Sequence, residues 1–226
     1  MKHISLKNHQ PHNIWFIADL HLGHAKDFIL KPRGYKTGEE AYTHTFQMLH
    51  QYIGPNDIVF NLGDMVIGAK ERTTEYANRL INFPCKAQYF IWGNHNAGAK
   101  QIYDDHRQEL GLLADDVELY PLNIPGTPFT FLGHRANITI DGISVVLDHY
   151  PIASWEGVSD AYMLHGHCHR NLKEDKTVRR LDLSWDWKKR PVNWDEIHEE
   201  LKGRVFNPVD HHGKSENNAE FFEPTT

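Results

Sequence analysis

The sequence has few cysteines, no long apolar run and no excess of positive charge. Only Cys85 and Cys168 occur among its 226 residues, without a paired spacing. This excludes a disulfide scaffold and predicts free thiols in a reducing, cytoplasmic compartment. No apolar stretch approaches membrane-spanning length, and the polar residues 1–13 lack the apolar segment of a secretory signal. We therefore expect no membrane association.

The charge balance argues against one class of partner. Asp and Glu number 30 against 24 Lys and Arg, which gives a formal net charge of −6. Because binding to duplex DNA requires a basic face, we do not expect duplex DNA as a partner. Composition predicts no particular oligomeric state. Histidine stands out, with 17 residues, and no tag-like run accounts for it.

The first half of the chain alternates between two kinds of segment. Apolar runs predict strands over 13–18, 57–62 and 87–92, and apolar residues at helical spacing predict helices over 39–53 and 70–82. This βαβαβ pattern is typical of a mostly parallel sheet that is buried on both faces. Ligands of such sheets bind beyond the carboxyl ends of the strands.

The second half is richer in strands. A helix is predicted over 97–112 and strands over 117–119, 128–132, 137–140, 143–147, 161–164 and 178–183, with a hairpin turn at Asp141-Gly142. A last helix over 194–201 is expected to be capped by Asn193 or Asp195. We expect one domain over residues 1–206 and a polar, flexible tail over 207–226.

Side chains that commonly bind metal ions follow five of the predicted strands: Asp19, His21, Asp64, Asn94, His149, His167 and His169. If the chain stays extended beyond Leu164, His167 and His169 point to the same side. Mixed carboxylate, amide and imidazole donors suit Mn²⁺, Fe²⁺ or Zn²⁺ better than Ca²⁺. Seven donors exceed the needs of one tetrahedral ion, which favours two ions that share a bridging carboxylate.

Together these residues resemble the motifs of the calcineurin-like metallophosphoesterase superfamily. Over residues 14–170 the blocks Asp19-x-His21, Gly63-Asp64, Gly93-Asn94-His95, His149 and Gly166-His167-x-His169 occur in the family's order. Leu22-Gly23-His24, His149-Tyr150-Pro151 and Arg190-Pro191-Val192-Asn193 are similar to small single-domain bacterial and phage members. The resemblance implies an α/β (α+β) fold, a β-sandwich of two mixed sheets flanked by helices in a four-layer αββα arrangement.

The resemblance also implies a role for each donor. One ion would be bound by Asp19, His21 and His169, and the other by Asn94, His149 and His167, with Asp64 bridging both. Mn²⁺ is the expected metal, with Fe²⁺, Zn²⁺ or Ni²⁺ as alternatives. A water or hydroxide between the ions would attack phosphorus, and His95 would protonate the leaving group.

Three further residues have weaker assignments. Most family members carry Asp at the position of Asn96, where the carboxylate orients the catalytic histidine. Asn96 would either orient His95 without adding negative charge or face away from it. His24 and Arg170 are candidates for substrate contact, although each could equally be a solvated side chain.

The function expected from these patterns is metal-dependent hydrolysis of a small, nucleotide-like phosphodiester or phosphomonoester. One alternative is a single-strand nuclease or a phosphatase that processes nucleic-acid ends. Another, from a different class, is a metal-bearing scaffold that binds a protein partner without turnover. The complete donor set and His95 favour an enzyme over the scaffold.

Overall fold

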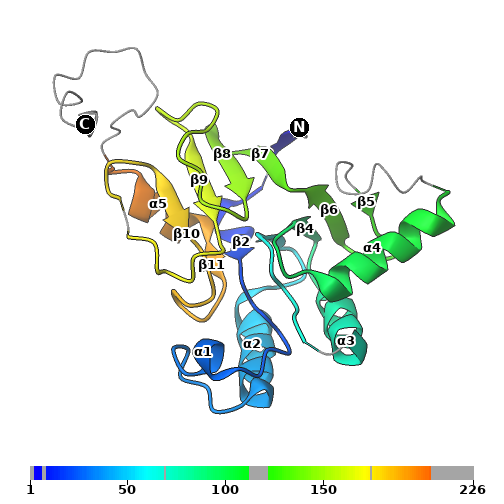
Figure 1. The fold of residues 1–226 in the computed structure, drawn as a ribbon. Helices are drawn as coiled ribbons and strands as arrows, with labels where there is room; N and C mark the ends of the chain where they lie inside the picture. The colour runs from blue at the N-terminus through cyan, green and yellow to red at the C-terminus, as the bar shows by residue number, and fades with distance from the viewer. Residues whose placement is uncertain (1–2, 7–8, 69, 112–121, 174, 205–226) are drawn as a thin grey trace, which may run out of the picture.

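The computed structural model describes residues 3–6, 9–68, 70–111, 122–173 and 175–204, and two β-sheets pack face to face within it (Figure 1). The six-stranded sheet has the order β11-β2-β3-β4-β6-β5, and the five-stranded sheet has the order β1-β7-β8-β9-β10. Both sheets mix parallel and antiparallel pairs. The predicted fold class, a β-sandwich of two mixed sheets with flanking helices, is confirmed.

The strands of the six-stranded sheet are β2 (Ile14–Ile17), β3 (Ile58–Asn61), β4 (Ala87–Ile91), β5 (Leu122–Asn123), β6 (Phe129–Gly133) and β11 (Val192–Asn193). Those of the other sheet are β1 (His3–Ser5), β7 (Arg135–Ile140), β8 (Ile143–Asp148), β9 (Tyr162–His165) and β10 (Arg180–Asp182). The helices are α1 (Asp27–Leu30), α2 (Gly38–Tyr52), α3 (Lys70–Ile81), α4 (Ala97–Glu109) and α5 (Trp194–Leu201), with a 3₁₀ turn η1 (Pro11–Asn13).

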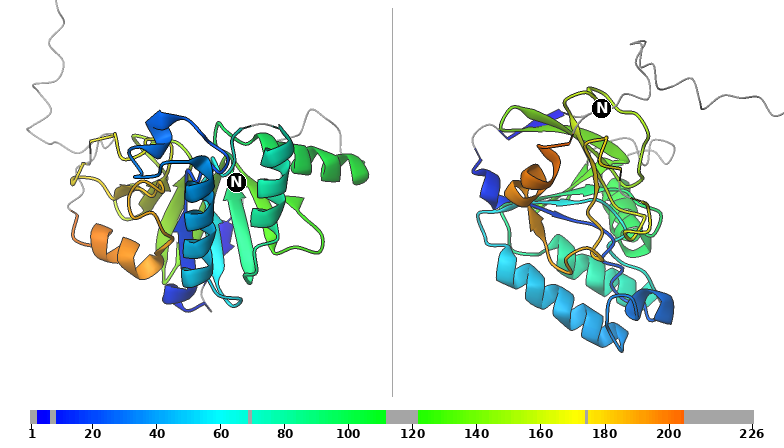
Figure 2. Two further views of the ribbon diagram at one scale, coloured as in Figure 1. Left: turned by 90° about the horizontal axis from the view of Figure 1, so that it is seen from below. Right: turned by 90° about the vertical axis from the view of Figure 1, so that its left-hand side faces the viewer.

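The central strands of the six-stranded sheet are buried on both faces. Alternate side chains point in opposite directions, so Phe16 and Phe60 enter the core between the sheets, whereas Val59 and Phe90 face the helices. Helices α2 and α3 run along this outer face in both views of Figure 2. On the outer face of the five-stranded sheet, Trp155 packs in a smaller cluster of buried residues.

The sequence predicted the longer elements well and missed the shortest ones. Strands β1, β5 and β11 and helix α1 have two to four residues, too few for a periodic pattern to identify them. Helix α5 begins with a capping box between Asn193 and Glu196, so Asn193 rather than Asp195 is its cap. The predicted strand 117–119 and tail 207–226 lie outside the described residues.

Among the residues whose structure is described, no helix is long and apolar enough to cross a membrane.

Candidate metal centre

The seven proposed donors follow five strands and meet at one edge of the sandwich. Asp19 and His21 follow β2, Asp64 follows β3, and Asn94 follows β4. The donors from the other sheet follow β8 (His149) and β9 (His167 and His169). The carboxyl ends of parallel strands in both sheets therefore bring together residues separated by up to 150 positions.

The backbone of these loops is unusual. Five of the donors have a left-handed φ, namely Asp19 (54°), His21 (49°), Asp64 (53°), His167 (69°) and His169 (48°). Residues other than glycine rarely have a φ angle in this region, and those that do cluster at functional sites. The donors therefore lie on tight turns in which the backbone leaves the extended conformation.

Glycines next to the donors allow the loops to approach one another closely. A Cβ atom on Gly93 would lie 2.1 Å from Oδ1 of Asp64, and one on Gly166 would lie 2.3 Å from Oδ2 of Asp19. Both distances are far inside van der Waals contact. The Gly-Asn-His and Gly-His-x-His motifs thus contain glycine because any side chain there would displace a donor carboxylate.

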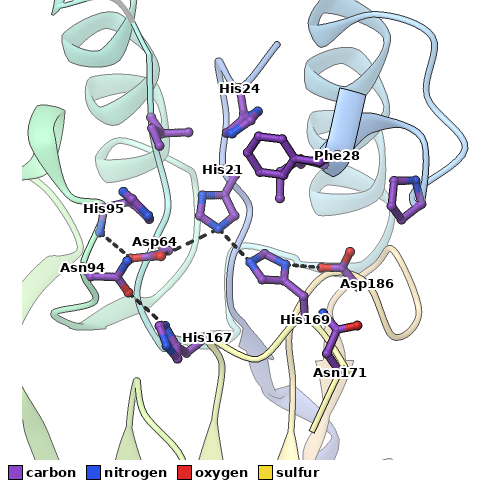
Figure 3. Close-up of a pocket in the computed structure, with 13 residues that line it drawn as sticks. His21, His24, Phe28, Asp64, Asn94, His95, His167, His169, Asn171 and Asp186 are labelled. Carbon is purple, nitrogen blue, oxygen red and sulfur yellow. Dashed lines mark hydrogen bonds and ion pairs between the residues drawn. The ribbon is translucent and has the colours of Figure 1, made fainter. Parts of the chain in front are cut away.

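One group of donors contains Asp19, His21 and His169, whose ligand atoms lie within 4.8 Å of one another. The two imidazoles face each other, with 3.2 Å between the Nε2 atoms of His21 and His169 (Figure 3). The backbone N–H of His167 donates to both carboxylate oxygens of Asp19, at 3.1 and 2.9 Å. This is the set expected for the first ion.

A second group is formed by Asp19, Asp64 and His149, with ligand atoms again within 4.8 Å. Oδ1 of Asn94 lies 3.0 Å from Nε2 of His149 and 3.0 Å from Nδ1 of His167. Asn94 and His167 therefore lie next to this second group. Oδ2 of Asp64 lies 3.7 Å from Nε2 of His21 and 3.5 Å from Nε2 of His149. The carboxylate of Asp64 therefore lies between the two groups.

The donor atoms fit a divalent transition-metal ion. His149 donates through Nδ1 to the carbonyl of Leu62 at 2.8 Å, which leaves the lone pair of its Nε2 directed at the other donors. Asp19 is fully buried, and this burial raises the pKa of its carboxyl to about 7. Burial likewise lowers the pKa of His21 to about 3, favouring a neutral imidazole. Lone pairs that converge on one small volume are the arrangement that a metal ion stabilises.

Two residues that the sequence did not indicate support this centre. Asp186 accepts a hydrogen bond from Nδ1 of His169 at 2.8 Å and also pairs with Arg33, whose Nη2 lies 2.7 Å from its Oδ2. Burial alone would raise the pKa of Asp186, but the hydrogen bonds from His169 and Arg33 hold this pKa well below its usual range. The ionised carboxylate orients His169 so that Nε2 faces the metal centre.

We expect Asp186→Asn to lower the affinity for Mn²⁺ by about 10–100-fold, because asparagine supplies no negative charge to hold the His169 tautomer. Calorimetric titration of metal-free protein with Mn²⁺ measures this effect. Asp195→Asn, an exposed change in α5, is the matched control and should bind like the parent. Equal affinities for Asp186→Asn and the parent would show that Asp186 has no part in binding the ion.

His95 lies beside the donor groups. Its backbone N–H donates to Oδ1 of Asp64 at 2.7 Å, and its ring is 5.6 Å from that of His21. No hydrogen bond joins the Asn96 side chain to this ring among the described residues. Its Oδ1 accepts from the backbone N–H of Gly93 at 3.4 Å and its Nδ2 donates to the carbonyl of Gly93. The expectation that Asn96 orients His95 therefore has no support in these contacts.

The segment after β9 differs from its sequence-based prediction. The extended conformation predicted beyond Leu164 is wrong, because the left-handed φ angles of His167 and His169 turn the chain instead. Their side chains diverge, His167 toward Asn94 and His169 toward Asp186 (Figure 3). Because of this divergence, two histidines separated by one residue contribute to two different groups of donors.

The two candidate substrate contacts have different surroundings. His24 lines a cavity of about 390 Å³ together with His95 and the donors His21, Asp64, Asn94, His167 and His169. Arg170 is not among the residues that line this cavity. Its guanidinium donates to the carbonyl of Asp182 at 3.1 Å and lies over the ring of Trp187. The geometry therefore supports a substrate contact for His24 and not for Arg170.

A β-sandwich with carboxylate, amide and imidazole donors at the ends of its strands is the architecture of a metal-dependent hydrolase. The chain belongs to the calcineurin-like phosphoesterase family, whose family model matches residues 12–225. Membership implies a metal-dependent hydrolase that acts on phosphoester bonds, and the Asp and His groups above are suited to binding the metal.

Individual proteins with similarity to this chain include one phage protein and one protein of known structure. The "Gene 66 protein" of Mycobacterium phage D29 is 25% identical over 203 residues, covering 83% of this chain and 94% of the phage protein. A crystal structure of a protein of unknown function, AQ665 from Aquifex aeolicus, shares the fold with a TM-score of 0.55 and 17% identity. That match covers 83% of this chain and 98% of the Aquifex chain. The phage protein agrees with a small member of the family, and the Aquifex structure agrees with the fold.

Proposed function

We propose that this protein uses two divalent ions, Mn²⁺ in the first instance, to hydrolyse a small nucleotide-like phosphoester. The observation that carries the proposal is the position of Asp64. Its carboxylate lies between the Asp19–His21–His169 group and the group around His149, at the floor of the cavity of about 390 Å³. A carboxylate in that position is suited to bridging two ions.

The donors and His95 have different roles in this proposed reaction. When bound, a pair of ions would supply an acidified water as nucleophile and neutralise charge on the phosphoryl oxygens. The donors Asp19, Asp64 and His149 would hold such ions at the cavity, where the ions would bind the substrate phosphate. His95, exposed and at the edge of the donor groups, is the side chain positioned to give a proton to the leaving oxygen.

Cavity size and charge favour a small substrate. A volume of about 390 Å³ is in the range of pockets for small molecules. The net charge of −6 opposes the approach of a long polyanion unless ions at the site compensate for it locally. We therefore rank a nucleotide-sized ester above single-stranded nucleic acid, and both above duplex DNA.

The test is a comparison of substrate classes with Mn²⁺-loaded protein. We expect turnover of bis(4-nitrophenyl) phosphate or 4-nitrophenyl phosphate and of small nucleotide esters, with little dependence on salt. Faster cleavage of single-stranded oligonucleotides would favour the nuclease or end-processing alternative. Tight duplex binding with a steep salt dependence would reverse the ranking. Absence of turnover on every class, with the metal bound, would instead favour the protein-binding scaffold.

A further inference from the structure

The cavity above the metal centre has two unlike parts. One part contains the donors, and the other is an apolar wall formed by Phe28, Ile29, Pro32 and Ile67. Phe28 has 71% of its surface exposed, more than the other large apolar residues among those described. An aromatic ring that is open to solvent inside a substrate cavity has a hydrophobic face available for a ligand.

His24 connects this wall to the metal centre. Its ring is 6.1 Å from that of His21 and 5.0 Å from that of Phe28, meeting the latter edge to face at 82° (Figure 3). Nδ1 of His24 accepts a hydrogen bond from the backbone N–H of Lys26 at 3.1 Å. The ring proton is therefore on Nε2, which has no partner among the described hydrogen bonds and can donate to a ligand.

The position of His95 predicts how a bound substrate is oriented in the cavity. Figure 3 shows His95 on the Asn94 side of His21, and Phe28 on the side of His169 and Asp186. His95 also lines a second cavity of about 410 Å³, together with Lys100 and His134. If His95 protonates the leaving oxygen, the leaving arm extends toward this second cavity. The arm that stays on phosphorus then lies against Phe28.

We propose that the substrate is a phosphodiester whose retained arm carries a planar aromatic ring, as a nucleoside does, and that this ring stacks on Phe28. Nε2–H of His24 donates to an oxygen between the ring and phosphorus. Water adds to phosphorus, the bond from phosphorus to the leaving oxygen breaks, and that oxygen takes up a proton. The products are a nucleoside monophosphate and an alcohol. This inference rests on the proposed hydrolysis and names its substrate class.

The test compares two diesters that differ only in the retained arm. Thymidine 5′-(4-nitrophenyl phosphate) carries a base, whereas methyl 4-nitrophenyl phosphate does not. We expect Phe28→Ala to lower kcat/KM for the thymidine ester about tenfold, the order of one lost base–aromatic stack, mainly through KM. The methyl ester should lose several-fold less. Phe28→Trp should restore the preference, and Leu110→Ala, a change of another exposed apolar residue, should not alter it.

Two results would overturn the proposal. Equal losses on both esters would put the leaving arm on Phe28, and no loss on either ester would show that Phe28 does not contact the substrate. Calorimetry on Mn²⁺-loaded protein separates this inference from the proposed activity. If the parent hydrolyses neither ester, the proposed function fails, but the subsite is still tested. It stands if Phe28→Ala weakens binding of thymidine 5′-phosphate about tenfold and methyl phosphate much less. It falls if both bind equally to parent and variant.

Discussion

Asp64→Ala is expected to lose both metal ions and all measurable phosphoesterase activity. The reason is the location of its Oδ2, 3.7 Å from Nε2 of His21 and 3.5 Å from Nε2 of His149, between the two donor groups. Removing His21 or His169 takes a ligand from the first group alone, whereas the carboxylate of Asp64 faces a histidine of each group. Elemental analysis of protein purified with Mn²⁺ should find about two equivalents in the parent and close to none in this variant.

His167→Ala is the informative control for this experiment. Nδ1 of His167 adjoins Oδ1 of Asn94 at 3.0 Å, and His167 is not part of the Asp19–His21–His169 group. We expect this variant to retain about one equivalent. A parent protein that binds one equivalent or less at saturating Mn²⁺ would contradict the two-ion proposal, whatever the variants do.

His95→Ala is expected to retain both ions and to lower turnover by about 10²–10⁴-fold, the usual contribution of a general acid. The metal content should persist because the contact between residue 95 and Asp64 is made by the backbone N–H, which alanine keeps. Steady-state kinetics together with elemental analysis measure the two effects separately. His106→Ala, a histidine on α4 that does not line the cavity, should leave both unchanged.

The leaving group decides whether proton donation is the role of His95. An alkoxide leaving group requires a proton, whereas nitrophenolate leaves readily without one. The loss in His95→Ala should therefore be much smaller for a nitrophenyl ester than for an alkyl ester. Equal losses on the two esters would show that the residue positions the substrate instead of protonating it.

The sequence could predict the strands and the donors at their ends, because both follow from local patterns. A continuous apolar run such as Ile14–Ile17 identifies a buried strand, and parallel strands end at the same edge of a sheet. The glycines of the Gly-Asn-His and Gly-His-x-His blocks are recognisable in the sequence, although the close approach of distant loops is what requires them.

The contacts that hold the donors in place could not be predicted in this way. Arg33 and Asp186 are 153 positions apart and belong to irregular segments, so no periodicity connects them before the chain has folded. The direction of a side chain in a turn is equally hidden. His167 and His169 diverge because of φ angles that residue type alone does not fix, and the Asn96 side chain bonds to the backbone of Gly93.

The left-handed backbone at five donors lowers the stability of the domain, which affects how such a site evolves. Each of these conformations costs on the order of 1 kcal/mol, so together they offset a sizeable part of the roughly 5–15 kcal/mol that stabilises a typical domain. Glycine at Asp19 or His21 would relieve the strain but remove a donor. Selection for stability alone would therefore drive the site toward loss.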